Sequence, residues 1–176
     1  EAFSRYNFVP HDLPDEIGNL FGERNTPEIY SRFNRVFDGF PLVARTSKGI
    51  IATHAGFPSE EDPPVEKIKR DDKEAILRIL WGDPLVSGTY RGSISDMTRF
   101  TESGLNSFLE RSGSKIFLRG HDHDVKGYSM YNDRMLTIFT SRRYENKGMG
   151  GVFMAASRAD EKMIRSVFDL DILRFS

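Results

Sequence analysis

The chain has 176 residues, of which 25 are Lys or Arg and 26 are Asp or Glu, so its formal net charge is −1. With 38% hydrophobic and 29% charged residues it has the composition of a globular chain, which excludes a disordered tail, and its length favours a single domain. A net charge near zero argues against a protein that coats nucleic acid or an anionic membrane. The sequence has no cysteine, which excludes a disulfide framework, a thiolate metal site and a cysteine nucleophile. No apolar run is long enough to span a bilayer. We therefore expect a cytoplasmic protein.

The N-terminal part is expected to be helical. Residues 1–25 mix polar and apolar side chains with prolines and predict loops and a short helix. Thr26 suits a helix N-cap and Pro27 suits the first helical position, and the helix is expected to end near Gly39. The apolar residues that share one face of this helix are Tyr30, Phe33, Val36 and Phe37.

A β-hairpin is expected next. Residues 42–45 and 49–53 are two β-rich runs, and the short polar segment between them is typical of a hairpin connection. The second strand places His54 at its C-terminal end. This position, just after a strand, makes His54 a candidate functional residue.

Two further helices and a long loop follow. Asp71 or Asp72 is expected to cap a helix that ends before Gly82, and Thr101 is expected to cap one that stops near Gly113. The apolar faces of the two helices are Ala75, Ile76, Ile79 and Leu80, and Leu105, Phe108 and Leu109. Residues 83–96 have no regular period, and so long a loop in a compact domain is usually functional or disordered.

Strands dominate the rest of the chain. They are expected at residues 115–119, 127–131, 134–140, 151–157 and 164–172. Asn132 and Asp133 suit a tight hairpin turn between the second and third of these. The loops that begin at His54, at Gly120 and at Ser141 all follow strands and are expected to meet at one end of a sheet. The pattern as a whole predicts mixed α and β content.

Three of the four histidines follow predicted strands. His54 lies before Ala55 and Gly56, and His121 and His123 belong to the segment Gly120-His121-Asp122-His123-Asp124. Neutral imidazoles bind zinc, iron and manganese, and nearby carboxylates favour harder ions. This cluster is a candidate metal site. His11, in a proline-flanked loop, is interpreted as an ordinary surface or hydrogen-bonded residue.

Five short motifs occur in order along the chain. They are Thr53-His54-Ala55-Gly56-Phe57-Pro58, Ile79-Leu80-Trp81-Gly82-Asp83-Pro84, Tyr90-Arg91-Gly92-Ser93, Leu118-Arg119-Gly120-His121 and Ser141-Arg142-Arg143-Tyr144-Glu145-Asn146. In the same order they resemble the HGG, LLWSDP, NDRG, RAH and SAPNY motifs of the phosphoprotein phosphatases. That family comprises the binuclear-metal serine/threonine phosphatases among the calcineurin-like metallophosphoesterases. The resemblance is strong from about residue 42 to residue 157.

The resemblance assigns roles to individual residues. It implies that His54 and His121 are metal ligands, that Arg91 grips the substrate phosphate and that Tyr144 lines the phosphate pocket. A planar guanidinium suits the Arg91 role, because it donates paired hydrogen bonds to two phosphate oxygens. Asp83 is implied to lie near the site as an orienting group.

The motifs also depart from the family pattern. Ala55 replaces a glycine, and Arg142 and Arg143 stand where the family has Ala and Pro, so that Arg143 is a further candidate phosphate contact beside Tyr144. His123 matches the superfamily pattern GHxH, whose second histidine binds metal. The sequence leaves open whether His123 is a ligand.

The family's GDxHG, GDxxDRG and GNHE motifs do not occur in these 176 residues. We therefore expect residues 1–176 to be the C-terminal part of a single metallophosphoesterase catalytic domain. The fold that the resemblance implies is α/β (α+β), a β-sandwich flanked by helices with metals at the strand C-termini.

The function that the resemblance implies is metal-dependent hydrolysis of phosphomonoesters, with a phosphoprotein as substrate. The implied cofactors are two divalent metal ions, manganese first, with iron or zinc as alternatives. No nucleic-acid or membrane partner is expected, and the sequence does not indicate a regulatory subunit. Two alternatives stay open: a nucleotide phosphatase of the diadenosine tetraphosphatase type, and a non-catalytic binding module that keeps the phosphatase fold.

Overall fold

The computed structural model describes residues 11–85, 98–122, 128–139, 153–156 and 164–174. The chain divides into two compact units, residues 1–41 and residues 42–176. Within the described residues, no helix combines the length and the apolarity that a membrane span requires.

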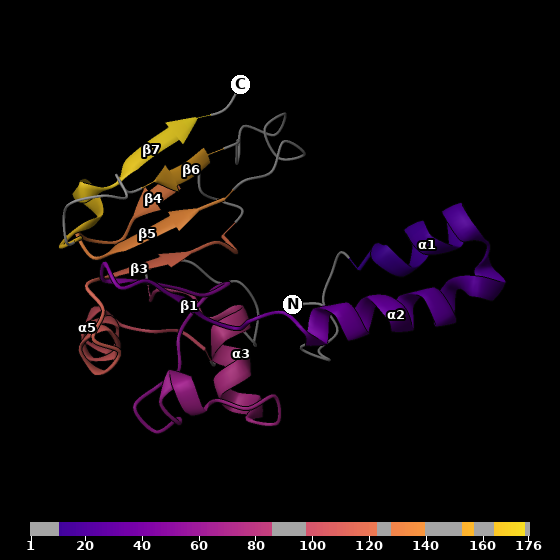
Figure 1. The fold of residues 1–176 in the computed structure, drawn as a ribbon, viewed down its shortest axis with the longest axis horizontal. Coiled ribbons are helices and arrows are strands. Elements are labelled where there is room, and N and C mark those ends of the chain that lie inside the picture. The colour runs from indigo at the N-terminus through magenta and orange to yellow at the C-terminus, as the bar shows by residue number, and fades with distance from the viewer. Residues whose placement is uncertain (1–10, 86–97, 123–127, 140–152, 157–163, 175–176) are drawn as a thin grey trace. The chain divides into compact units, whose positions relative to one another are not determined.

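The first unit is a pair of helices joined by a short turn. Helix α1 spans Leu13–Phe21, the 3-10 turn η1 spans Glu23–Asn25 and helix α2 spans Thr26–Asp38 (Figure 1). The predicted helices are confirmed, although Thr26 is the first helical residue of α2 and not its cap. The described residues of α2 include no buried side chain, and Phe33 and Val36 are 40% and 56% exposed.

The second unit is built on a five-stranded sheet in the order β1-β2-β3-β5-β4. Strands β2, β3 and β5 are parallel neighbours, while β1 and β4 are antiparallel strands at the two edges. The strands are β1 (Ala44–Arg45), β2 (Ile50–Ala52), β3 (Ile116–Arg119), β4 (Tyr128–Met130) and β5 (Met135–Ile138). A second, antiparallel pair consists of β6 (Phe153–Ala156) and β7 (Asp171–Arg174).

The two predicted hairpins are present. Strand β1 pairs with β2 across a turn in which Thr46 N–H donates to the Ile50 carbonyl at 2.9 Å. Gly49 in that turn has a φ of +99°, which suits glycine because it lacks a Cβ. Strand β4 pairs with β5, and the Asn132 side chain in their turn accepts a hydrogen bond from Arg134 N–H at 2.8 Å.

Helices cover one face of the sheet. Helix α3 spans Lys73–Trp81 and helix α5 spans Glu102–Arg111, and a short 3-10 turn, η2, precedes α3 at Val65–Lys67. Both helices confirm the predicted apolar faces. Thr101 caps α5 as predicted, because its Oγ1 accepts a hydrogen bond from Gly104 N–H at 3.2 Å.

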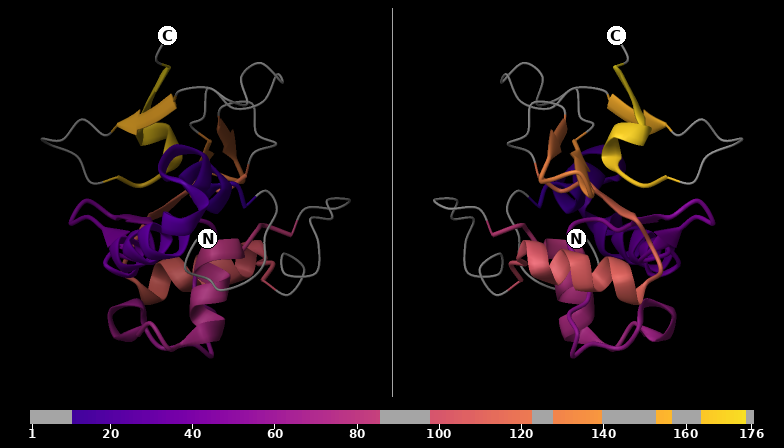
Figure 2. Two further views of the ribbon diagram at one scale, coloured as in Figure 1. Left: turned by 90° about the vertical axis from the view of Figure 1, so that its right-hand side faces the viewer. Right: turned by 90° about the vertical axis from the view of Figure 1, so that its left-hand side faces the viewer.

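The core has two layers, one on each face of the sheet. One cluster joins the loop residue Phe57 and the α5 side chains to the strands, and the other joins the strands to the segment that leads into β7. Figures 1 and 2 show α3 and α5 together on one side of the sheet and the β6–β7 pair on the opposite side. The buried residues of the first cluster are Ile51, Phe57, Phe100, Leu105, Phe108, Leu109, Phe117 and Met135. Those of the second are Ile116, Leu136, Ile164, Val167 and Leu170.

One strand prediction is wrong. Residues 164–172 were expected to form a single strand, but the segment contains the 3-10 turn η3 (Val167–Asp169), and β7 begins only at Asp171. The Asp169 carboxylate accepts hydrogen bonds from Arg165 N–H at 2.9 Å and Ser166 N–H at 3.0 Å. These bonds fold the backbone into a capped turn, which removes those amides from strand pairing.

Candidate active site

The ends of two neighbouring parallel strands bring His54 and His121 together. Ala52 of β2 pairs in register with Leu118 of β3, and the chain reaches His54 and His121 soon after each strand ends. Gly120 N–H donates to the His54 carbonyl at 2.9 Å, which continues the pairing beyond the strands. The two imidazole rings lie edge to face with centroids 5.2 Å apart. The predicted meeting is confirmed for these two junctions, while the third, at Ser141, lies outside the described residues.

His121 is held in an uncommon backbone conformation. Its φ is +69°, in the left-handed region that side chains other than glycine seldom adopt. Asp122 N–H donates to the Gly120 carbonyl at 2.8 Å, so that His121 is the central residue of a three-residue turn. A conformation of this kind costs on the order of 1–3 kcal/mol and persists where the surroundings fix it, most often at functional sites.

The C-terminal end of α3 packs against both histidine segments. The Trp81 ring lies edge to face with the His121 ring at a centroid distance of 5.7 Å. Ala55 N–H and Gly56 N–H, directly after His54, both donate to the Ile79 carbonyl, at 2.9 and 3.2 Å. The helix end therefore lies against both halves of the site.

Two glycines allow this close packing. A Cβ placed on Gly56 would lie 2.6 Å from the Arg78 carbonyl oxygen and 2.7 Å from Gly82 Cα, and a Cβ on Gly82 would meet the same carbonyl at 2.6 Å. All of these distances are shorter than the contacts that real Cβ atoms make, so neither glycine position has room for a side chain. Close packing therefore explains why glycine stands at position 56, in the motif around His54, and at position 82, directly before Asp83.

Asp83, two residues after the end of α3, forms a buried ion pair with Arg119. Its Oδ1 accepts a hydrogen bond from Arg119 Nη2 at 2.5 Å, and the two side chains are 8% and 0% exposed. Arg119 is the last residue of β3, two positions before His121. Sequence reasoning placed Asp83 near the site but missed Arg119. The available signal was an arginine inside an otherwise apolar strand, because a charged side chain is seldom buried without a partner.

The remaining predicted site residues are untested. Arg91, His123, Arg143 and Tyr144 lie outside the described residues. Their assignments stay predictions. His11, interpreted as an ordinary residue, lies in the first unit, where its Nε2 is 2.9 Å from the Tyr30 hydroxyl.

The described residues fit a metal site in part. Two imidazoles at this separation are donors that manganese, iron and zinc accept. Among the residues with described positions, however, no group of three or more His, Asp or Glu side chains is close enough to hold an ion. A metal site built on His54 and His121 would need further donors from outside the described residues.

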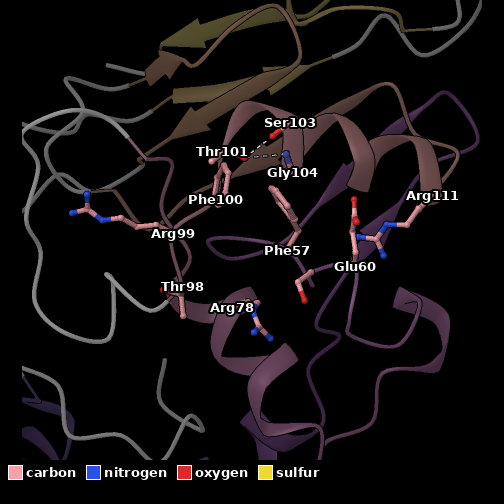
Figure 3. A pocket seen from close by; sticks show the side chains of 11 residues that line it. Phe57, Glu60, Arg78, Thr98, Arg99, Phe100, Thr101, Ser103, Gly104 and Arg111 are labelled. Atoms are coloured by element: carbon pink, nitrogen blue, oxygen red, sulfur yellow. Dashed lines mark hydrogen bonds between the residues drawn. The ribbon is translucent and has the colours of Figure 1, made fainter.

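A hollow of about 340 Å³ lies on the helical side of the sheet, and its lining includes neither histidine (Figure 3). Its apolar wall consists of Phe57 and Phe100, whose rings are 4.5 Å apart. The guanidinium of Arg78 in this lining is ion-paired with Asp62 at 2.9 Å, and that of Arg111 donates to the Pro58 carbonyl at 3.3 Å. Since these cations already have protein partners, we do not assign the hollow a role in the chemistry.

Comparison with known proteins identifies relatives of the chain. Residues 11–125 match the family model of the calcineurin-like phosphoesterases. The "Probable serine/threonine-protein phosphatase" of Encephalitozoon cuniculi is 28% identical over 86% of this chain and 37% of its own length. Human serine/threonine-protein phosphatase 5 is 25% identical over 76% of this chain and 29% of its own length. The chain thus spans about a third of these curated relatives.

The fold is similar to a solved phosphatase structure. A protein serine/threonine phosphatase from Saccharomyces cerevisiae, described as similar to human phosphatase PP5, superimposes with a TM-score of 0.67 at 21% identity. The match covers 93% of this chain and 54% of the yeast chain. It confirms the predicted mixed α/β fold of the phosphatase type. Since the family model matches well over half of the residues, the chain belongs to the calcineurin-like phosphoesterase family.

Proposed function

We propose that this protein is a metal-dependent phosphomonoester hydrolase that removes phosphate from serine or threonine side chains of proteins. The observation that carries the proposal is the edge-to-face pair of His54 and His121 at the ends of two neighbouring parallel strands. Family membership supports the hydrolase class. The named serine/threonine phosphatases among the relatives support a phosphoprotein substrate.

In this proposal His54 and His121 form part of a site for two divalent ions, and manganese is the proposed metal. Such ions, when bound, supply a water of lowered pKa and polarise the phosphoryl oxygens. The tight turn at His121 and the packing of Ala55 and Gly56 on α3 hold the two imidazoles in place before substrate arrives. Preorganisation of this kind avoids rearrangement during the reaction.

The substrate phosphate is assigned to the arginines and the tyrosine of the later motifs. We propose that Arg91 donates paired hydrogen bonds to two phosphate oxygens and that Tyr144 and Arg143 line the same pocket. Asp83 is assigned the part of an orienting group near the site. The proposed location is cytoplasmic, because a chain without cysteine needs no oxidising compartment to fold.

The proposal is tested by alanine substitutions in the full-length protein, with manganese-stimulated hydrolysis of an aryl phosphate and of a phosphoserine peptide as assays. Replacing a residue that only orients a metal ligand commonly lowers activity 10–100-fold. Replacing a proposed ligand itself, in His121→Ala or His54→Ala, should therefore lower kcat/KM by roughly 100-fold or more. His11→Ala is the matched control and should stay within about twofold of wild type, because the His11 ring is hydrogen-bonded to the Tyr30 hydroxyl and no site role is assigned to it.

Three results would contradict the proposal in different ways. Undiminished activity of His121→Ala would show that the histidine pair takes no part in catalysis. Hydrolysis of a dinucleoside polyphosphate in preference to the phosphopeptide would indicate a nucleotide phosphatase. Purified protein without bound metal and without activity would indicate a binding module that keeps the fold.

A further inference from the structure

We propose that Arg119 is a positioning residue for His121, acting through its buried ion pair with Asp83 to lock the end of α3 against the end of β3. The proposal rests on the function proposed above, because it concerns how the same site is held. It adds a residue to which no role in the site has been assigned.

The ion pair joins two chain segments at the point where each leaves its secondary structure. Asp83 follows the last residue of α3 by two positions, and Arg119 is the last residue of β3. The joined atoms are 2.5 Å apart, and the side chains are almost wholly buried, at 8% and 0% exposure. Burying two charges is costly unless their geometry is good, and removing one partner leaves the other charge without compensation. The pair therefore fixes where the helix end and the strand end lie relative to each other.

The helix end that Asp83 anchors is the one that contacts both histidine segments. The Trp81 ring contacts the His121 ring, and Gly82 touches Gly56 in the loop that follows His54. The Ile79 carbonyl accepts the two amides that follow His54. A shift of this helix end relative to β3 would move the Trp81 ring away from His121 and would separate the two imidazoles.

The backbone of His121 makes the site sensitive to such a shift. At a φ of +69° the residue occupies a conformation that only tight surroundings maintain. Arg119 lies two residues before it and is fixed through Asp83, so the strand end cannot relax to relieve the turn. A planar guanidinium is directional and a lysine ammonium is not, so Arg119→Lys is expected to restore the arrangement only in part.

The test uses the full-length protein with Arg119→Met, Arg119→Lys and the double variant Asp83→Asn/Arg119→Met, which removes both charges of the pair. Arg78→Met is the matched control, because it breaks a different ion pair, between Arg78 of α3 and Asp62, in which the arginine side chain is 25% exposed. Each variant is first shown to fold by circular dichroism and thermal melting. The readouts are the nuclear Overhauser contact between the Trp81 and His121 rings without metal, the Mn²⁺ affinity by calorimetry, and kcat and KM on an aryl phosphate.

In Arg119→Met, or in the double variant if the single variant does not fold, we expect the ring contact to be lost and Mn²⁺ affinity to fall roughly tenfold or more, as for other groups that orient a ligand. The fall in activity should lie in kcat. Arg119→Lys should recover part of both readouts, and Arg78→Met should change neither.

A folded Arg119→Met or double variant that keeps the ring contact and binds Mn²⁺ within about twofold of wild type would overturn the positioning role. If wild type itself bound no Mn²⁺ and hydrolysed no phosphate, the proposed function would fail instead. The ring contact in the metal-free variants would then decide the positioning role by itself.

Discussion

Gly56 and Gly82 touch through their backbones at the base of the candidate site, and neither tolerates a methyl group. The Cβ of Gly56→Ala would lie 2.6 Å from the Arg78 carbonyl oxygen, and backbone atoms on both sides leave no flexible neighbour to move. Overpacking of this kind costs about 1–3 kcal/mol, so we expect Gly56→Ala to lower the free energy of unfolding by that amount. Urea denaturation monitored by circular dichroism measures it.

Gly104→Ala is the control for that substitution. A Cβ there would meet Thr101 Oγ1 at 3.5 Å, an ordinary contact, and alanine favours a helix over glycine by about 1 kcal/mol. Gly104→Ala should therefore leave stability unchanged or raise it. Equal stability of Gly56→Ala and wild type would show that the His54 loop can move away from α3 without cost.

Trp81 offers a second prediction at the scale of one residue, because it is the single tryptophan of these 176 residues and its ring contacts His121. The proposed binding of Mn²⁺ at His121 would change the charge next to the indole, so titration with Mn²⁺ should change the Trp81 emission and excess EDTA should reverse the change. His121→Ala should abolish the response, and His11→Ala should keep it. A response that survives in His121→Ala would place the ion elsewhere.

At the scale of one element, helix α5 depends on its first turn. Thr101 Oγ1 accepts a hydrogen bond from Gly104 N–H, and loss of such a cap costs about 1 kcal/mol. We expect Thr101→Ala to lower the free energy of unfolding by about that amount in chemical denaturation, while Thr101→Ser, which keeps the acceptor oxygen, should lose less than half of it. Equal losses in the two variants would mean that the methyl group of Thr101, and not its hydroxyl, supports the helix.

Elements whose signals are local were predicted well. The apolar spacing of α3 and α5, the cap at Thr101 and the two hairpin turns are all contained in short stretches of sequence, and the structure confirms them. The segment 164–172 was not predicted correctly, because its apolar and β-branched residues favour a strand. The Asp169 side chain instead withdraws the amides of Arg165 and Ser166 into a turn. Composition alone does not distinguish these two outcomes.

The candidate site was predictable where it follows from the ends of strands. His54 and His121 were expected to meet because each directly follows a predicted strand. Their rings are in contact, since β2 and β3 are parallel neighbours that end at the same edge of the sheet. Arg119 was not identified, because an arginine in a strand usually points to solvent. Its burial depends on Asp83, which lies 36 residues earlier in the chain. A pairing across that distance is decided by how α3 packs on the sheet.

At the scale of the whole molecule, the site should couple metal binding to stability. Ligands at the ends of separate strands come together only in the folded chain, so an ion held there binds the folded state and not the unfolded one. At an Mn²⁺ concentration of about 100 times Kd the free energy of unfolding should rise by about 2.7 kcal/mol. Thermal melting of the full-length protein with and without Mn²⁺ measures the shift. The melting temperature of His121→Ala should be the same with and without Mn²⁺, and that of His11→Ala should rise with Mn²⁺ as in wild type.

The parallel pairing of β2 with β3 also determines when the site arises during folding. Two parallel strands need a long crossover between them, and here it contains α3 and α5. Closing a connection of this length is slower than forming a helix or a hairpin. A refolding chain should therefore gain most of its helical signal before it can bind Mn²⁺. The time at which a refolding chain becomes able to bind Mn²⁺ would therefore report when β2 pairs with β3.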